Sequence, residues 1–179
     1  MMPGSEQTQD RNHGRRGFTL IELLTVVGII MVLAGLILSG LNVARARASV
    51  VRARRDIAQL VTGWNAYFAD YGRFPTVSGN SVTNGLIVTG RDVVQILRGR
   101  ENYNSQNPRR VTYMDFHVNT TQFPDPWGNL YRIAWDEEPY DVKISVRGET
   151  LRMSLVVWSA GEDGADDTED DVLSWRQSQ

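Results

Sequence analysis

The chain has 179 residues, with 21 acidic and 19 basic side chains, two histidines and no cysteine. This length suits one modest domain and one special segment. The lack of cysteine excludes disulfides and thiolate chemistry, and the net charge of −2 is unlike the basic surface of a nucleic-acid binder. Because most catalytic side chains are scarce as well, we expect no enzyme and no binding of nucleic acid.

A long apolar run follows a short polar stretch at the N-terminus. Residues 18–44 read FTLIELLTVVGIIMVLAGLILSGLNVA, and Glu22 is their one ionisable side chain. A helix needs about 20 consecutive apolar residues to cross the core of a bilayer. The run therefore predicts a transmembrane helix, and it is too long for the apolar region of a secretory signal peptide.

Glu22 is costly inside such a segment. A carboxylate there is expected to be paired, to lie near an interface or to have a function. The residues alone leave two interpretations open. Glu22 is either a first-turn acid that favours the positive end of the helix dipole or a functional charge.

The helix is expected to continue beyond residue 44. Apolar side chains recur there at three- and four-residue spacing, at Ile57, Leu60, Val61, Trp64, Phe68 and Tyr71. This spacing predicts one buried face. The opposite, polar face is predicted to hold Arg54, Arg55, Asp56, Gln59 and Asp70. Gly72 and Pro75 predict that the helix ends near Tyr71.

The rest of the chain has the pattern of a small α+β domain. Segment 76–90 predicts a loop, and residues 92–98 predict a short helix. Strands are predicted at 130–135, 142–147 and 151–158. We expect a turn at Gly148-Glu149 to join the last two, and an antiparallel sheet to pack on the apolar face of the long helix.

Seven carboxylates crowd residues 162–171, which read EDGADDTEDD. They repel one another unless a cation, water or arginine offsets them. Calcium takes several oxygen ligands in flexible geometry, which suits such a segment, although the spacing does not match an EF-hand. By composition, a solvated acidic loop is the other interpretation.

Four stretches resemble a known family. Residues 17–24, GFTLIELL, resemble the cleavage signature of type IV prepilins and type II secretion pseudopilins. Residues 71–76, YGRFPT, resemble the segment that ends the long helix in pseudopilins, and residues 125–131, DPWGNLY, resemble their D-P-W-G-N-x-Y turn. Residues 159–175 are similar to the calcium loop of the major, or G, pseudopilins.

The resemblance implies a precursor that is cut between Gly17 and Phe18, with residues 1–17 as the removed leader. It also implies methylation of the new Phe18 amine. In this family Glu22 would neutralise the Phe18 ammonium of a neighbouring subunit during assembly. The chain would cross the inner membrane of a Gram-negative-type bacterium once, with its C-terminal domain in the periplasm.

A pilin-like α+β fold follows from the same resemblance. Residues 18–44 would form the transmembrane and filament-core helix, residues 45–72 its periplasmic half, and residues 73–179 a small periplasmic domain. The long helix would pack its C-terminal half on the antiparallel sheet, and the loop at 159–175 would bind calcium. The expected ligands are Asp163, Thr168, Asp170 and Asp171.

The implied function is structural. The chain would be a subunit of a type II secretion pseudopilus, assembled from the inner membrane to drive export of folded proteins. Its partners would be further copies in a helical filament, the prepilin peptidase, the minor pseudopilins and the inner-membrane assembly platform. One alternative is a minor type IV pilin for adhesion, motility or DNA uptake. Another is a membrane-tethered, calcium-dependent binding module that uses Trp127, Trp135 or Trp158.

An arginine cluster follows the apolar run. Its members are Arg45, Arg47, Arg52, Arg54 and Arg55. Such a cluster suits a helix face that meets solvent or lipid headgroups. In a filament it could equally pair with acids on an adjacent subunit, and the residues alone leave both interpretations open.

Overall fold

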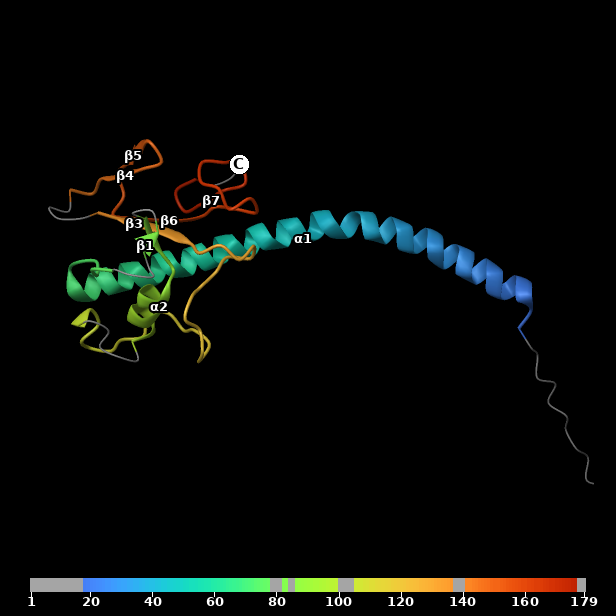
Figure 1. The fold of residues 1–179 in the computed structure, drawn as a ribbon, viewed down its shortest axis with the longest axis horizontal. Coiled ribbons are helices and arrows are strands. Elements are labelled where there is room, and N and C mark those ends of the chain that lie inside the picture. The colour runs from blue at the N-terminus through green and yellow to red at the C-terminus, as the bar shows by residue number, and fades with distance from the viewer. Residues whose placement is uncertain (1–17, 78–81, 84–85, 100–104, 137–140, 177–179) are drawn as a thin grey trace, which may run out of the picture. The chain divides into compact units, whose positions relative to one another are not determined.

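A computed structural model describes residues 18–77, 82–83, 86–99, 105–136 and 141–176 (Figure 1). The chain divides into two compact units, of which the first ends at Ala44 and the second begins at Arg45. The elements are α1 (Leu20–Tyr71), β1 (Val82–Thr83), β2 (Leu86–Val88), α2 (Arg91–Arg98), β3 (Arg132–Trp135), β4 (Ile144–Val146), β5 (Glu149–Leu151), β6 (Leu155–Ser159) and β7 (Val172–Leu173).

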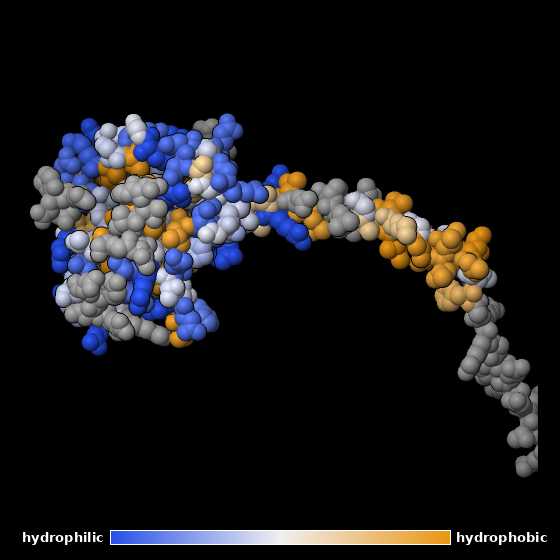
Figure 2. Space-filling view, in the orientation of Figure 1, coloured by the Kyte–Doolittle hydropathy of each residue, from blue (hydrophilic) through white to orange (hydrophobic). Residues whose placement is uncertain are grey.

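The side chains in the first part of α1 are exposed from Leu20 to Gly35. Figure 2 shows that the surface of this part is largely hydrophobic. Over the residues that the structure describes, no helix combines the length and the hydropathy that crossing a membrane requires.

Helix α1 ends at Tyr71, as the sequence predicts. Gly72 has a φ of +66° and donates its backbone N–H to the carbonyl oxygen of Phe68 at 2.7 Å. This bond closes the last turn of the helix. Pro75 follows three residues later and cannot continue a helix, because it lacks a backbone N–H.

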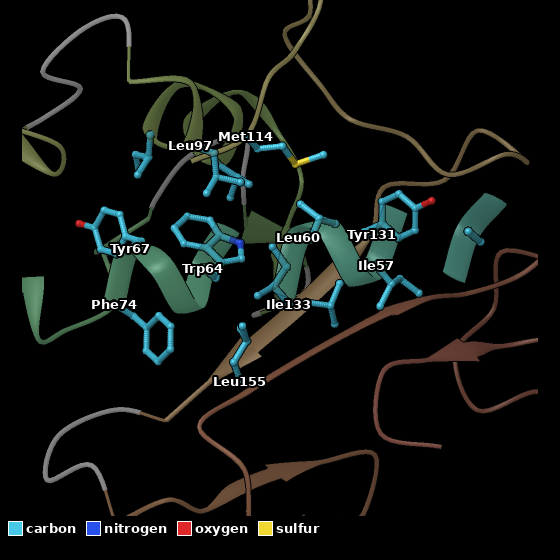
Figure 3. Close-up of a cluster of buried hydrophobic side chains, with 14 of the residues drawn as sticks. Ile57, Leu60, Trp64, Tyr67, Phe74, Leu97, Met114, Tyr131, Ile133 and Leu155 are labelled. Carbon is cyan, nitrogen blue, oxygen red and sulfur yellow. The ribbon is translucent and has the colours of Figure 1, made fainter. Parts of the chain in front are cut away.

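One face of α1 forms the floor of the core in the second unit. Its side chains have exposed fractions of 0 to 4%, and they are Ala53, Ile57, Leu60, Trp64 and Tyr67. Figure 3 shows side chains of this face among Ile133 of β3 and Leu155 of β6 on one side and Leu97 of α2 on the other. The predicted apolar face is therefore confirmed at its centre. Burying each such side chain stabilises the fold by roughly 1.5 to 3 kcal/mol.

Five strands form one antiparallel sheet in the order β1-β2-β3-β6-β7. Strand β6 is buried at every position. Leu155 and Val157 face the helix, whereas Val156 and Trp158 pack in a second cluster with residues of β4. Because both of its faces are covered, β6 reads as a continuous apolar run rather than as an alternating one.

Strands β4 and β5 form a separate hairpin, so the prediction that 142–147 shares one sheet with 130–135 and 151–158 is wrong. Arg147 and Gly148 form the turn, with φ values of +54° and +71°. Positive φ at both positions is typical of a two-residue type I′ hairpin turn. The turn therefore comes one residue earlier than predicted, and the chain after β5 continues into β6, which pairs with β3.

The predicted loop at 76–90 contains two short strands, β1 and β2. Ile87 and Val88 of β2 pair with Ile133 and Arg132 of β3. So short a strand has no recognisable periodicity and forms because a neighbouring edge is available. The predicted helix at 92–98 is confirmed as α2.

Asp56 departs from the predicted polar face of α1, because it is 5% exposed. Its Oδ2 accepts a hydrogen bond from Tyr131 Oη at 3.1 Å. Arg52 Nε and Arg55 Nη2 lie 3.8 and 3.7 Å from its oxygens. These groups compensate a carboxylate that would be costly to bury alone. Burial and the adjacent Asp56 raise the pKa of Tyr131, so its hydroxyl remains a donor.

Candidate functional site

A capping box opens helix α1. Thr19 donates from its backbone N and from Oγ1 to Glu22 Oε2, each at 3.0 Å. Glu22 N donates in return to Thr19 Oγ1 at 3.3 Å. This reciprocal arrangement satisfies backbone donors that the first turn of a helix leaves free. This role of Thr19 was not predicted, although the T-x-x-E pattern before an apolar run is a recognised signal of a capping box.

Glu22 retains capacity for a further contact. Its side chain is exposed, and in the described part of the chain only Oε2 takes part in the cap. Phe18 lies directly before the cap and is 85% exposed. The predicted leader, residues 1–17, and with it Gly17 of the predicted cleavage site, lie outside the described residues.

The turn at residues 125–131 holds the start of the acidic loop, residues 159–175, in place. Asp125 is 4% exposed and accepts a hydrogen bond from Ser159 Oγ at 2.5 Å. Asn129 donates from its backbone N to Asp125 Oδ1 at 2.8 Å and from Nδ2 to the Gly161 carbonyl oxygen at 3.0 Å. The turn therefore positions the first residues of the acidic loop.

Three of the four expected ligands meet inside the acidic loop. Thr168 Oγ1 lies 2.7 Å from Asp170 Oδ1 and 3.4 Å from Asp163 Oδ1. It also lies 3.2 Å from the carbonyl oxygen of Ala165. Carboxylate, hydroxyl and main-chain oxygens are the donors that calcium takes. The chemistry of this set therefore fits a calcium ion.

Backbone N–H groups earlier in the acidic loop hold the Asp170 carboxylate in place. Its Oδ2 accepts the N–H groups of Glu162 and Asp163 at 2.6 and 3.2 Å. The hydrogen bond from Thr168 lowers the pKa of Asp170. Gly161 has a φ of +64°, and a Cβ at this position would lie 2.3 Å from Asp170 Oδ2. The close approach of the carboxylate to the backbone therefore requires glycine there.

The fourth expected ligand, Asp171, faces an arginine. Its Oδ2 lies 2.5 Å from Arg147 Nη2 and accepts the N–H groups of Asp167 and Thr168 at 2.9 and 3.1 Å. Its side chain is 2% exposed, and Oδ1 has no hydrogen-bond partner in the described structure. Burial raises the pKa of Asp171, and the guanidinium of Arg147 opposes this shift.

Two arginines outside the acidic loop neutralise part of its charge. Arg147, in the β4–β5 turn, also pairs with Asp167. Arg132, on β3, places Nε 2.8 Å from Asp166 Oδ1. Arginine was one predicted offset for the acidic segment, but the sequence pattern did not identify these two residues. Both lie outside the loop in the sequence, and only the tertiary fold brings them to its acids.

Within the described ranges, no three carboxylate, histidine or cysteine side chains group closely enough to hold a metal ion. The set around Thr168 contains two carboxylates, Asp163 and Asp170. Calcium prefers about 6 to 8 oxygens. Hydroxyl, main-chain and water oxygens would therefore have to supply much of the coordination.

The three tryptophans of the predicted binding platform are covered to different extents. Trp158 has no exposed surface, and its Nε1 donates to Asp166 Oδ1 at 2.9 Å. Trp135 stacks on Phe74 with a centroid distance of 5.2 Å, and Trp127 is half-buried against the main core. None of the three is an exposed platform, which counts against a tethered binding module.

The sequence is similar to those of several known proteins that share one name. The profile described as the prokaryotic N-terminal methylation motif matches residues 12–38. The type II secretion system core protein G of Escherichia coli K12 is 31% identical over 162 residues, covering 90% of this chain and 91% of the relative. Core protein G of Klebsiella michiganensis is 26% identical over 171 residues, covering 94% and 98%.

A solved structure also matches, the major pseudopilin from the type 2 secretion system of enterohaemorrhagic Escherichia coli. The TM-score is 0.41 and the sequence identity 20%, over 74% of this chain and 90% of that one.

A helix packed on a small antiparallel sheet, together with the N-terminal methylation motif, defines a pilin-like α+β protein. More narrowly, the chain belongs to the family of the type II secretion system core protein G. It is a structural subunit of the pseudopilus and not an enzyme. The family and the motif imply a membrane-anchored periplasmic protein that assembles with other components of the secretion system.

Proposed function

We propose that the chain is made as a precursor, cut between Gly17 and Phe18 and methylated at Phe18. Residues 18–44 then anchor it as a single pass in the inner membrane, with the second unit in the periplasm. From there it assembles into the pseudopilus that drives export of folded proteins. The match of residues 12–38 to the N-terminal methylation motif supports this proposal. Its specific partners in this proposal are the prepilin peptidase, the minor pseudopilins and the inner-membrane assembly platform.

The observation that carries this proposal is the exposed pair of Phe18 and the capped Glu22. Glu22 holds its own helix end through Oε2 and has Oε1 available in the described structure. The ammonium at Phe18 of a neighbouring copy is a cation of matching size and charge. Charges attract more strongly where water is excluded, and an unpaired carboxylate is costly there, so the pairing would favour assembly.

Two substitutions distinguish the helix-capping role of Glu22 from the role of its negative charge. Glu22→Gln removes the negative charge, but glutamine also serves in a capping box. Thr19→Ala removes the capping hydroxyl, keeps the charge and costs roughly 0.5 to 2 kcal/mol of helix stability. We expect mass spectrometry of native membranes to find a methylated Phe18 at the mature N-terminus. Crosslinking is expected to find multimers in wild type and Thr19→Ala and to lose them in Glu22→Gln.

An intact leader in wild type would contradict processing. Equal loss of multimers in both variants would reduce Glu22 to a cap.

We further propose that calcium closes the acidic loop through Asp163, Thr168 and Asp170. Their oxygens gather around one hydroxyl, and the sheet arginines form no ion pair with these carboxylates among the described residues. Asp171 remains a candidate through its buried Oδ1. When bound, the ion would supply positive charge where the loop is otherwise self-repelling.

The calcium proposal is tested on the full chain in detergent by thermal unfolding with calcium, with magnesium and with a chelator. A ligand at 100 times its Kd adds about 2.7 kcal/mol of stability. We expect calcium to raise the Tm of wild type but not of Asp163→Asn/Asp170→Asn. Asp115→Asn, an exposed acid outside the loop, is the matched control and should respond like wild type. A chelator without effect on wild type would refute the site.

A further inference from the structure

The arginine cluster of α1 lies in the second unit, and all five side chains are exposed. Arg52 and Arg55 are 63% and 68% exposed and reach only the buried Asp56, at 3.8 and 3.7 Å. Arg45, Arg47 and Arg54 form no ion pair with any described residue. Most of this positive charge is therefore uncompensated in the single chain.

Helical geometry sorts the cluster into two flanks. At 3.6 residues per turn, Arg45, Arg52 and Arg55 share one flank of the buried face of α1. Arg47 and Arg54 lie on the opposite flank. We call the first group, Arg45, Arg52 and Arg55, the basic strip. Ala48 and Gln59 belong to the same flank and are exposed.

The acidic loop of the same chain lies on the Arg54 side. Arg54 lines a cavity of about 440 Å³ together with Asp167, Glu169 and Asp171. None of the three arginines of the basic strip lines this cavity. The basic strip and the acidic loop therefore lie on opposite flanks of the helix, and one chain cannot easily pair them with each other.

Part of the acidic loop is free to meet a partner. Arg132 and Arg147 neutralise Asp166, Asp167 and Asp171. Four exposed acids have no ion pair with a described residue, and these are Glu162, Asp163, Glu169 and Asp170. Two would serve the proposed calcium site, which leaves Glu162 and Glu169 with their charge uncompensated.

We propose that the basic strip of one subunit docks on the acidic loop of a neighbouring copy. The proposal rests on assembly of the chain into a pseudopilus. Complementary patches on different faces of one chain make a head-to-tail contact, and such a contact builds an open helical filament when its rotation does not close a ring. Such charge complementarity sets the orientation and register of the contact. The occupant of the strip is thus a second copy of this chain.

The test uses charge reversal on the full chain in cells that carry the secretion apparatus, with crosslinked multimers as the readout. Arg52→Glu/Arg55→Glu makes the strip net negative, and Glu162→Arg/Glu169→Arg reverses the two uncompensated charges of the loop without touching the calcium set. We expect each variant alone to lose about tenfold in multimers, because like charges then face each other. Expressed together, the two variants should restore multimers, since each reversed patch meets a complementary patch on the other chain.

Co-expression is decisive because a contact within one chain could not be restored in this way. Arg73→Glu/Arg91→Glu changes the charge equally at exposed positions elsewhere in the unit and should leave multimers unchanged. A second variant, Ala48→Glu/Gln59→Glu, places two negative charges among the three arginines of the strip but keeps Arg52 and Arg55 beside Asp56. It should also lose multimers while retaining the Tm of wild type.

The proposal would be overturned if multimers were unchanged in both strip variants, Ala48→Glu/Gln59→Glu and Arg52→Glu/Arg55→Glu. It would also be overturned if co-expression of the two charge-reversed chains failed to restore multimers. If the strip variants lose only binding to vesicles that contain phosphatidylglycerol, the strip contacts lipid and the proposal fails. Multimers that depend on Glu22 but not on the strip would refute this inference alone. A wild-type chain without multimers would refute the proposed assembly as well.

Discussion

The core beneath α1 and the acidic loop are held together by opposite kinds of force. In the core, side chains such as Leu60, Trp64 and Ile133 have at most 1% of their surface exposed and meet other apolar groups. In the acidic loop, Asp166, Asp167 and Asp171 meet guanidinium groups, and Asp170 meets backbone N–H groups. The first region therefore responds mainly to changes in packing, and the second to changes in charge.

This difference separates the forces that stabilise the core from those that hold the acidic loop. Apolar packing is non-directional and nearly independent of pH and salt. Charge pairs at a surface depend on salt, on protonation and on available partners. A subunit that must keep its fold while changing neighbours can thus have a permanent core and an adjustable loop.

Truncation in the core should cost the most. Trp64 has no exposed surface and contacts Tyr67 and Trp135 edge to face, at centroid distances of 5.6 and 5.2 Å. Trp64→Ala is expected to lower the free energy of unfolding by about 3 to 5 kcal/mol because of the cavity it leaves. Urea unfolding of the full chain in detergent, followed by circular dichroism, measures this loss. Gln59→Ala, on the exposed side of α1, is the control, and an equal loss there would contradict the assignment of the core.

Removing the arginine beneath the acidic loop should act locally. Arg147→Met leaves Asp171 buried without its cation, which is expected to cost about 2 to 3 kcal/mol. Hydrogen exchange should show faster opening of residues 159–175, while α1 keeps its protection. Replacing Asp171 by Leu in the same chain should recover most of the loss, because the unpaired charge is removed.

Lys143→Met is the control for this pair. Lys143 and Asp141 are 54% and 48% exposed, so the loss of their contact should have no measurable effect. If Arg147→Met opened α1 as readily as the loop, the two regions would not be independent.

Asp56 combines features of the apolar core and of the acidic loop, because it is a carboxylate buried at the edge of the core. Tyr131→Phe removes its phenol donor and should cost about 1.5 kcal/mol. Tyr113→Phe, which removes an exposed bond of 2.7 Å to Asp70, is the control and should cost less. Chemical unfolding of both variants measures the difference. Equal losses would mean that burial of Asp56 does not strengthen its bond.

Acid should weaken the loop through Asp170. The hydrogen bond from Thr168 lowers the pKa of Asp170 below its ordinary value of 3.8. Its stabilising contribution is therefore complete above 3.8 and is lost as the pH falls through the lower, folded-state value. Asp171, whose pKa is raised, acts in the opposite sense. We expect the Tm of Asp170→Asn to fall less than that of wild type between neutral and acid pH, measured with a chelator present. An equal fall in the Tm of both proteins would contradict this role of Asp170.

The prediction from sequence was accurate where structure is local. The three-and-four spacing from Ile57 to Trp64 marked the buried face of α1, and Gly72 marked its end. The hairpin was misplaced by one residue, because the φ of a turn residue such as Arg147 is not visible in composition. Strand β2 was missed because three residues carry too little pattern.

In the acidic loop, the sequence by itself determined that a dense negative charge needs an offset. The resemblance of its motifs implied Asp163, Thr168, Asp170 and Asp171 as calcium ligands, which remains a prediction, and the N-terminal methylation motif was recognisable around Glu22. Only the tertiary structure decided that Arg132 pairs with Asp166 and Arg147 with Asp171, and that Asp56 is buried against Tyr131. Periodicity and motifs act between residues close in the chain, whereas charges pair across strands that are brought together only when the core forms.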